Sequence, residues 1–176
     1  MIIWIASYPK SGNTWVRSFL TAYYFCENGV FNIDKLSLIE DYPNKQFFRE
    51  TVKQGEIHNH WESSQKDICD QKKAKFLKTH NSLITAFGND FTKPKYSLGV
   101  IYVIRDPRNV ITSVKNHNDL ESYEKALKFM QDENKVLEDY PHLKNYAKTN
   151  IVNSWRINYQ SWMSNKSIKR LSLIHI

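Results

Sequence analysis

The sequence predicts an α/β fold in which a parallel central sheet is flanked by helices. Two observations support this prediction: short apolar runs alternate with helical patterns along the chain, and no hairpin signal joins two strands directly. With 176 residues, the chain is expected to form a single domain over residues 1–176. Its apolar fraction of 41% suffices for a core and excludes a disordered composition.

The first half of the chain is expected to begin with a strand, a loop and a helix. Ile2–Ala6 is a short apolar run that ends at a turn, as in a buried strand. The loop Ser7–Gly12 then leads into an amphipathic helix over Thr14–Phe25. Residues 32–73 are predicted to be helical and irregular, and Lys75–Lys78 is a short strand candidate.

The second half continues the alternation of strands and helices. Val100–Ile104 is the strongest strand signal, and Asp106 followed by Pro107 suits the N-cap and first turn of a helix that runs to about His117. Two further helices are predicted over Ser122–Glu138 and Ile151–Asn165.

The last predicted helix carries an aromatic stripe, and a strand-like run ends the chain. Trp155, Tyr159 and Trp162 fall on one helix face, which indicates packing rather than function. The final run, LSLIHI at 171–176, resembles a strand. In parallel sheets, ligands bind beyond the carboxyl ends of strands. Because the chain stops where the next such loop is due, we expect it to be incomplete at the C-terminus.

The chain is basic, with a formal net charge of +7. Such a charge favours an anionic partner. The Lys and Arg residues are spread along the sequence, and no RRM, zinc-finger or homeodomain signature is present, so no nucleic-acid partner is expected. The charge itself does not decide the partner, since a small phosphorylated ligand or an acidic acceptor explains it as well as nucleic acid does. A lysine-rich soluble surface without a specific partner is the alternative.

Composition also bears on the compartment. No apolar run reaches the roughly 20 residues that span a bilayer, and the N-terminus lacks the basic stretch of a signal peptide. Cys26 and Cys69 fit reduced thiols better than a disulfide framework. The sequence therefore predicts a cytoplasmic protein without a membrane span.

The segment YPKSGNTW carries the strongest local signal. A buried strand, a short loop and a helix start direct backbone N–H groups to one point, where anions bind. Lys10 adds a charge, Thr14 adds a hydroxyl, and Gly12 permits close approach. A Walker A loop is excluded because Gly does not directly precede Lys10, as the Walker A pattern requires. A magnesium-dependent kinase that uses Asp106 is therefore the weaker alternative.

Three segments, in order, resemble sulfotransferases that use 3′-phosphoadenosine 5′-phosphosulfate (PAPS). YPKSGNTW is similar to their 5′-phosphosulfate loop, FLKTHN at 76–81 to their Lys-x-His strand end, and VIRDPRNVITSVKNH at 103–117 to their 3′-phosphate site. NSWRINYQSW resembles the helix with paired tryptophans that follows. The resemblance covers most of the chain and implies a P-loop nucleotide-hydrolase-like fold, with PAPS as co-substrate and adenosine 3′,5′-bisphosphate (PAP) as product.

The resemblance also implies residue roles. His80 would be the general base, since a histidine with a pKa near 6.5 is largely neutral at pH 7. Lys10 would stabilise the leaving group, and Lys78, the lysine of the Lys-x-His pair, would be the third catalytic residue. The residues expected to bind the co-substrate are Lys10, Ser11, Gly12, Asn13, Thr14, Trp15, Arg105 and Ser113. Packing under the helix is the alternative for Trp15, and a surface ion pair is the alternative for Arg105.

Several questions stay open at this point. The pairs His58/His60 and His117/Asp119 match no zinc spacing, so no metal is expected. The sequence does not identify the acceptor, which is expected to be a small molecule or a saccharide with a hydroxyl or an amine. It does not give the oligomeric state either. The family's Tyr-Glu-Asp-like segment and Arg-Lys-Gly loop, which would contact adenine and the 3′-phosphate, are not found. A catalytically inactive remnant that binds PAPS weakly or not at all is therefore the main alternative.

Overall fold

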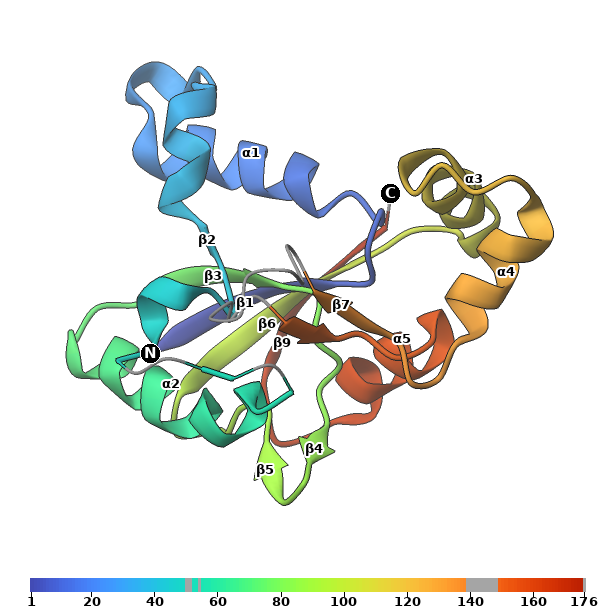
Figure 1. The fold of residues 1–176 in the computed structure, drawn as a ribbon. Helices are drawn as coiled ribbons and strands as arrows, with labels where there is room; N and C mark the ends of the chain where they lie inside the picture. The colour runs from blue at the N-terminus through green and yellow to red at the C-terminus, as the bar shows by residue number, and fades with distance from the viewer. Residues whose placement is uncertain (50–51, 54, 139–148, 176) are drawn as a thin grey trace.

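The computed structural model of the protein describes residues 1–49, 52–53, 55–138 and 149–175. Its centre is a five-stranded sheet in the order β2-β3-β1-β6-β9, in which every neighbouring pair is parallel (Figure 1). This confirms the predicted α/β fold with a parallel sheet. The strands are β1 (Ile2–Ser7), β2 (Glu40–Asp41), β3 (Lys75–Thr79), β6 (Ser97–Ile104) and β9 (Arg170–His175).

Helices cover both faces of the sheet (Figure 1). On one face Trp4 of β1 belongs to a cluster with Trp61 and Trp162, and on the other Ile5 packs with Val16. Because both faces of the sheet are buried, successive side chains of β1 all face a core, which explains the continuous apolar run of this strand. The α-helices are α1 (Asn13–Phe25), α2 (Trp61–Asp70), α3 (Pro107–His117), α4 (Tyr123–Gln131) and α5 (Trp155–Ser164). The 3₁₀ helices are Glu27–Gly29, Ile33–Leu38, Lys45–Phe47 and η4 (Ile57–His60).

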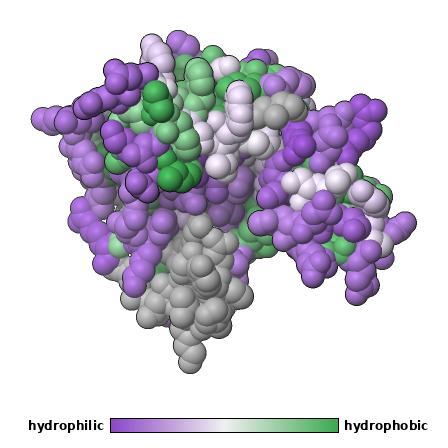
Figure 2. All heavy atoms as spheres, turned by 90° about the horizontal axis from the view of Figure 1, so that it is seen from above, coloured by the Kyte–Doolittle hydropathy of each residue, from purple (hydrophilic) through white to green (hydrophobic). Residues whose placement is uncertain are grey.

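The face that carries α1 and the 3₁₀ segments after it shows a patch of apolar side chains when seen from above (Figure 2). Phe19, Tyr23, Val30 and Ile33 are all exposed. Helix α1 therefore packs on the sheet through Val16 and presents much of its aromatic surface to solvent.

Two of the predicted helices are too long. The helix expected over Ser122–Glu138 ends at Gln131, and the helix expected over Ile151–Asn165 begins at Trp155. In both cases part of the excess lies in a strand, because Val136–Glu138 (β7) pairs antiparallel with Thr149–Ile151 (β8). Tertiary pairing here overrides local helical preference.

The expectation of no hairpins is also wrong. Besides β7–β8, Thr85–Ala86 (β4) pairs antiparallel with Asn89–Asp90 (β5). The two-residue loop between β4 and β5 is Phe87–Gly88, which lacks the Asn-Gly or Asp-Gly sequence that marks such turns. The aromatic stripe of α5 packs as predicted: Trp162 is buried and donates to the carbonyl of Asn81, at 2.9 Å.

Gly99 of β6 is required by the close approach of β9. A Cβ at this position would lie 2.7 Å from the Lys169 carbonyl oxygen and 2.6 Å from Leu171 Cγ. Because the carbonyl belongs to the backbone, it cannot rotate away. We expect Gly99→Ala to lower the free energy of unfolding by about 1–3 kcal/mol in urea denaturation.

Leu98→Ala, at the exposed neighbouring position of β6, is the control for this substitution and is expected to change stability less. An unfolding midpoint of Gly99→Ala equal to that of the parent protein would contradict the close β6–β9 contact.

Candidate functional site

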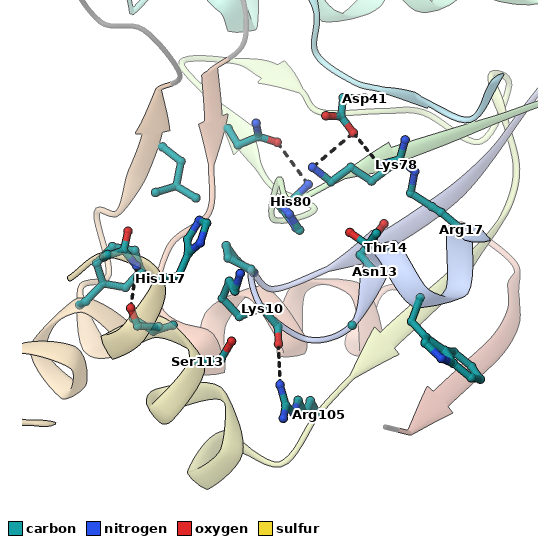
Figure 3. A pocket seen from close by; sticks show the side chains of 18 of the residues that line it. Lys10, Asn13, Thr14, Arg17, Asp41, Lys78, His80, Arg105, Ser113 and His117 are labelled. Carbon is teal, nitrogen blue, oxygen red and sulfur yellow. Dashed lines mark hydrogen bonds and ion pairs between the residues drawn. The ribbon is translucent and has the colours of Figure 1, made fainter. Parts of the chain in front are cut away.

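Three neighbouring strands end at one edge of the sheet. Because β3, β1 and β6 are adjacent and parallel, the segments that leave their carboxyl ends meet there. His80 follows β3, the loop 8–12 follows β1, and Arg105 follows β6. They border a cleft of about 900 Å³ (Figure 3). Its lining is Pro9, Lys10, Gly12, Asn13, Thr14, Trp15, Arg17, Ser18, Asp41, Lys78, His80, Arg105, Ser113, Val114, His117, Asn118, Phe129, Leu137, Glu138 and Asn150.

The loop after β1 is tightly curled. Lys10 has φ +66° and Gly12 has φ +94°, so two of three consecutive residues are left-handed. Glycine adopts this conformation without strain, whereas a lysine there costs about 1–2 kcal/mol. The N–H of Ser11 turns back to the carbonyl of Tyr8, at 3.3 Å. Such alternation of backbone conformations forms concave groups of N–H donors that bind anions.

The start of α1 differs from those of α3, α4 and α5, and like that of α2 it has no side-chain cap. Gly12 at its N-cap offers no side-chain hydrogen bond, and its first turn holds no acidic residue. Helices α3, α4 and α5 each begin with a side-chain cap, from Asp106, Ser122 and Ser154 respectively. The first N–H groups of α1 therefore lack a capping side chain, and with Lys10 beside them they suit an anion.

The predicted loop residues contribute in different ways. Lys10, Gly12 and Thr14 line the cleft. Asn13 also lines it, but its Nδ2 donates to the Ile5 carbonyl (3.0 Å) and to Ser7 Oγ (3.1 Å). Its side chain therefore fastens the loop to β1, which leaves its backbone as the group available to a ligand.

Two further predicted residues sit at opposite extremes of burial. Ser11 is 1% exposed, does not line the cleft, and its Oγ has no hydrogen-bond partner within the described part of the chain. Trp15 lines the cleft with 68% of its surface exposed, so the alternative of packing under the helix is wrong for this residue.

His80 is held by hydrogen bonds to its ring and to its backbone. Its Nδ1 lies 2.8 Å from the Ser7 carbonyl oxygen. Because a carbonyl only accepts, Nδ1 carries the proton, and Nε2 is then the basic nitrogen of the neutral ring. The His80 N–H donates to Asn150 Oδ1 (3.2 Å), and its carbonyl accepts from Asn158 Nδ2 (3.0 Å).

Arg105 lies between the loop and α3. Its Nη1 donates to the carbonyl of Lys10, at 3.3 Å, and within the described residues no carboxylate forms an ion pair with it. The alternative of a surface ion pair is therefore not what the structure shows. Ser113 lines the same cleft from α3, and His117, one helical turn further on, also points into it (Figure 3).

Asp106 is engaged at the start of α3. Its carboxylate accepts from the Arg108 N–H at 2.8 Å and pairs with the Arg108 guanidinium. These hydrogen bonds lower the pKa of the Asp106 carboxyl to about 2. Asp106 acts as a helix cap and does not line the cleft, which removes the residue on which the magnesium-dependent kinase alternative rests.

Lys78 belongs to a charge cluster on the other wall of the cleft. Lys78 Nζ and Arg17 Nη1 each lie 3.3 Å from Asp41 Oδ1 (Figure 3). Arg17 also donates to the carbonyls of Leu36 (3.2 Å) and Ile39 (2.5 Å). Burial lowers the pKa of the Arg17 guanidinium, and the Asp41 carboxylate opposes this shift.

Sequence reasoning missed several residues of this site, among them Arg17, His117, Asp41 and Asn150. Arg17 follows Thr14 by nearly one turn of α1, a spacing that could have revealed it. His117 follows Ser113 by four residues on α3, which is a similar signal. Asp41 and Asn150 carry no local signal, because only strand pairing brings them to the cleft.

Cations outnumber carboxylates in the lining of the cleft. Its ionisable side chains, apart from histidines, are Lys10, Arg17, Lys78, Arg105, Asp41 and Glu138. The described residues include no group of three or more His, Cys, Asp or Glu side chains that could share a metal ion.

None of the described helices is both long and apolar enough to cross a bilayer. Cys26 and Cys69 are free thiols.

Comparison with known proteins gives one finding about the whole chain. The family model described as "Sulfotransferase domain" matches residues 2–175. The matched range includes the loop after β1, His80 and Arg105. No curated protein matches the sequence closely enough to count as a relative.

Proposed function

This chain belongs to the sulfotransferase domain family, and we propose from that premise that it transfers a sulfuryl group from PAPS to a hydroxyl or amine of an acceptor. The proposal treats residues 1–176 as one sulfotransferase domain. The observation that carries it is the meeting of Lys10, His80 and Arg105, from three strand ends, around one cleft.

The residues of the cleft fit the two charged ends of PAPS. The left-handed loop, the uncapped start of α1 and Lys10 suit the 5′-phosphosulfate. Ser11 Oγ, buried without a partner among the described residues, is a hydroxyl that the loop can turn to a phosphate oxygen. Arg105 and Ser113 suit the 3′-phosphate, because a guanidinium can bind phosphate oxygens with two hydrogen bonds. The exposed Trp15 offers an apolar surface beside the nucleotide.

PAPS supplies a sulfuryl group joined to a good leaving phosphate. As the acceptor oxygen or nitrogen bonds to sulfur, the bond between sulfur and the phosphate oxygen breaks, and PAP leaves. His80 Nε2 takes the acceptor proton, and the Nδ1–H bond to the Ser7 carbonyl stabilises the imidazolium that forms. Lys10 stabilises the negative charge that develops on the leaving phosphate. Lys78, held by Asp41, adds a second cation near His80.

The first test is a calorimetric titration of PAP into the protein without added magnesium, with ADP as the comparison ligand. We expect selective binding of PAP. Arg105→Ala should weaken it about 10- to 100-fold, because hydrogen bonds to charged groups contribute about 1.5–3 kcal/mol.

Arg108→Ala is the matched control, since Arg108 lies on the same segment but pairs with Asp106 and does not line the cleft. Its PAP affinity should stay within about twofold of the parent value. Equal affinity for PAP and ADP, or equal losses in the two arginine variants, would contradict the assignment of the 3′-phosphate site.

A further inference from the structure

A carboxylate with no function of its own in the proposed transfer lies on the wall of the cleft beside Lys78. Asp41 is the last residue of β2, and Lys78 is its direct partner in the parallel pair of β2 and β3. The Tyr42 N–H donates to the Lys78 carbonyl at 2.7 Å, which fixes this register. Because directly paired residues of neighbouring strands point to the same face of a sheet, the register itself brings Asp41 to Lys78.

The face of the sheet that carries this pair is the one covered by α1. Phe76, two residues before Lys78 on β3, packs with Ile5 and Val16 on that face. Because side chains alternate along a strand, Lys78 points to the same face. The side chain of Lys78 is 14% exposed and that of Asp41 is 23% exposed. A lysine ammonium so far removed from water needs a paired opposite charge.

Arg17 of α1 holds the same carboxylate from the other side. Its Nη1 lies 3.3 Å from Asp41 Oδ1, the oxygen that Lys78 Nζ also approaches at 3.3 Å (Figure 3). Arg17 Nη2 donates to the carbonyls of Leu36 and Ile39, in the segment that leads into β2. Asp41 is thus fixed by its strand and by α1, whereas a lysine carries its charge on a flexible stem. The fixed carboxylate therefore restricts where the flexible ammonium can lie.

The geometry of the ion pair suits a lysine that also binds a ligand anion. Its length of 3.3 Å exceeds the distance of about 2.7–2.9 Å that is usual for hydrogen bonds between charged groups. An ammonium has three N–H donors, so it can contact a carboxylate and a second anion at once. One carboxylate faces two cations here, so the three side chains together carry a net positive charge. Lys78 can therefore turn toward an anion in the cleft while Asp41 keeps it in place.

The order of the strands indicates which end of PAPS lies near Lys78. In the order β3-β1-β6, the loop after β1 stands between the strand of Lys78 and the strand that precedes Arg105. Arg105 is assigned to the 3′-phosphate in the proposed function. Lys78 precedes the proposed base, His80, by two residues, and the base acts where the acceptor meets the sulfur. In the proposed complex, the anionic group on the side of Lys78 is therefore the sulfuryl group.

We propose that Asp41 is a positioning residue that directs Lys78 to the sulfuryl group of PAPS. This inference rests on the proposed function, and it assigns to Asp41 an effect that its own charge would not have. A carboxylate in the cleft repels anions, so its removal by itself would favour the binding of PAPS and PAP alike. A positioning role instead predicts that removal of the charge weakens PAPS, which carries the sulfuryl group, and does not weaken PAP, which lacks it.

The experiment is calorimetric titration of PAPS and, separately, of PAP into the parent protein and into Asp41→Asn, with no acceptor present. We expect the affinity for PAPS to fall about three- to tenfold in the variant, the size of a coupling between residues in contact. The affinity for PAP should stay within about twofold of the parent value or rise. A merely structural role of Asp41 would weaken both ligands, and retained PAP binding shows that the variant is folded.

Three further variants show whether Asp41 acts through Lys78. In a Lys78→Met background, Asp41→Asn should cause no further loss of PAPS affinity, because the side chain that it positions is gone. Asp41→Glu, which keeps the charge, should restore part of the PAPS affinity that Asp41→Asn loses. Asp67→Asn is the matched control, since Asp67 pairs with Arg49 and does not line the cleft. Its affinities for PAPS and PAP should equal those of the parent protein.

The outcomes separate this inference from the proposed function. Parent-like PAPS affinity in Asp41→Asn, equal losses for PAPS and PAP, or the same loss in the Lys78→Met background each overturn the role of Asp41. Selective binding of PAP by the parent protein still supports the proposed function in all three cases. If the parent protein binds neither PAPS nor PAP, the proposed function fails, and the inference fails with it.

Discussion

Replacing His80 with alanine is expected to lower turnover by about 10²- to 10⁴-fold, the range that a general base contributes. Affinity for PAP is expected to change by less than about threefold. The reason is positional: the ring hydrogen bond to the Ser7 carbonyl makes Nε2 the basic nitrogen, which is proposed to take the acceptor proton, whereas Arg105 and the loop after β1 are proposed to bind the nucleotide. Steady-state sulfation of a panel of phenol, alcohol, amine and saccharide acceptors and calorimetry with PAP measure the two quantities.

His60→Ala is the matched control, because His60 does not line the cleft. Its turnover should match that of the parent protein. A large loss of PAP affinity in His80→Ala would contradict the role of His80 as the base and indicate that His80 binds the nucleotide. A parent chain that binds PAP but transfers no sulfuryl group to any acceptor would favour the catalytically inactive remnant.

Replacing Asn158 with alanine is expected to lower the free energy of unfolding by about 3–5 kcal/mol, as loss of a buried hydrogen-bond network does. Asn158 is fully buried, and its Oδ1 accepts from the Tyr102 hydroxyl at 2.8 Å. Its Nδ2 donates to the carbonyls of His80 and Val152, both at 3.0 Å. The substitution leaves these groups without a partner inside the core. Urea denaturation and a melting temperature lower by about 6–15 °C test this.

Asn109→Ala, at an exposed position in the first turn of α3, is the control. It should change stability by less than about 0.5 kcal/mol. A loss below about 1 kcal/mol in Asn158→Ala would mean that the partners of Asn158 find other hydrogen bonds, and that α5 does not fix the backbone of His80.

Elements with strong local signals could be predicted from the sequence. The strands β1 and β6 are continuous apolar runs because both faces of the sheet are covered. Helix α3 begins where Asp106 and Pro107 predict, since the Asp106 side chain caps it. The β4–β5 and β7–β8 hairpins could not be predicted, because Phe87 is unusual in its turn and β7 lies in a segment with helical periodicity.

The residues of the candidate site also fall into those that the sequence predicts and those that it does not. Lys10, His80 and Arg105 each come just after a strand signal, so a parallel sheet predicts that they meet. Asp41 reaches the cleft through a two-residue strand, and Asn150 through a hairpin. Strands this short leave no periodic pattern in a sequence. The orientation of the Asn13 side chain toward β1 likewise depends on the folded loop.

The position of β1 in the sheet affects how the protein folds during synthesis. β1 leaves the ribosome before the other described strands of this sheet, yet it lies in the middle of the sheet, between β3 and β6. Its first partner is made only after residues 8–74, which takes several seconds at about 5–20 residues per second. During that interval an apolar strand has no partner, and such strands readily pair with other chains. Nascent chains are therefore most prone to aggregate before β3 emerges, and the cleft, which needs both partners of β1, forms late.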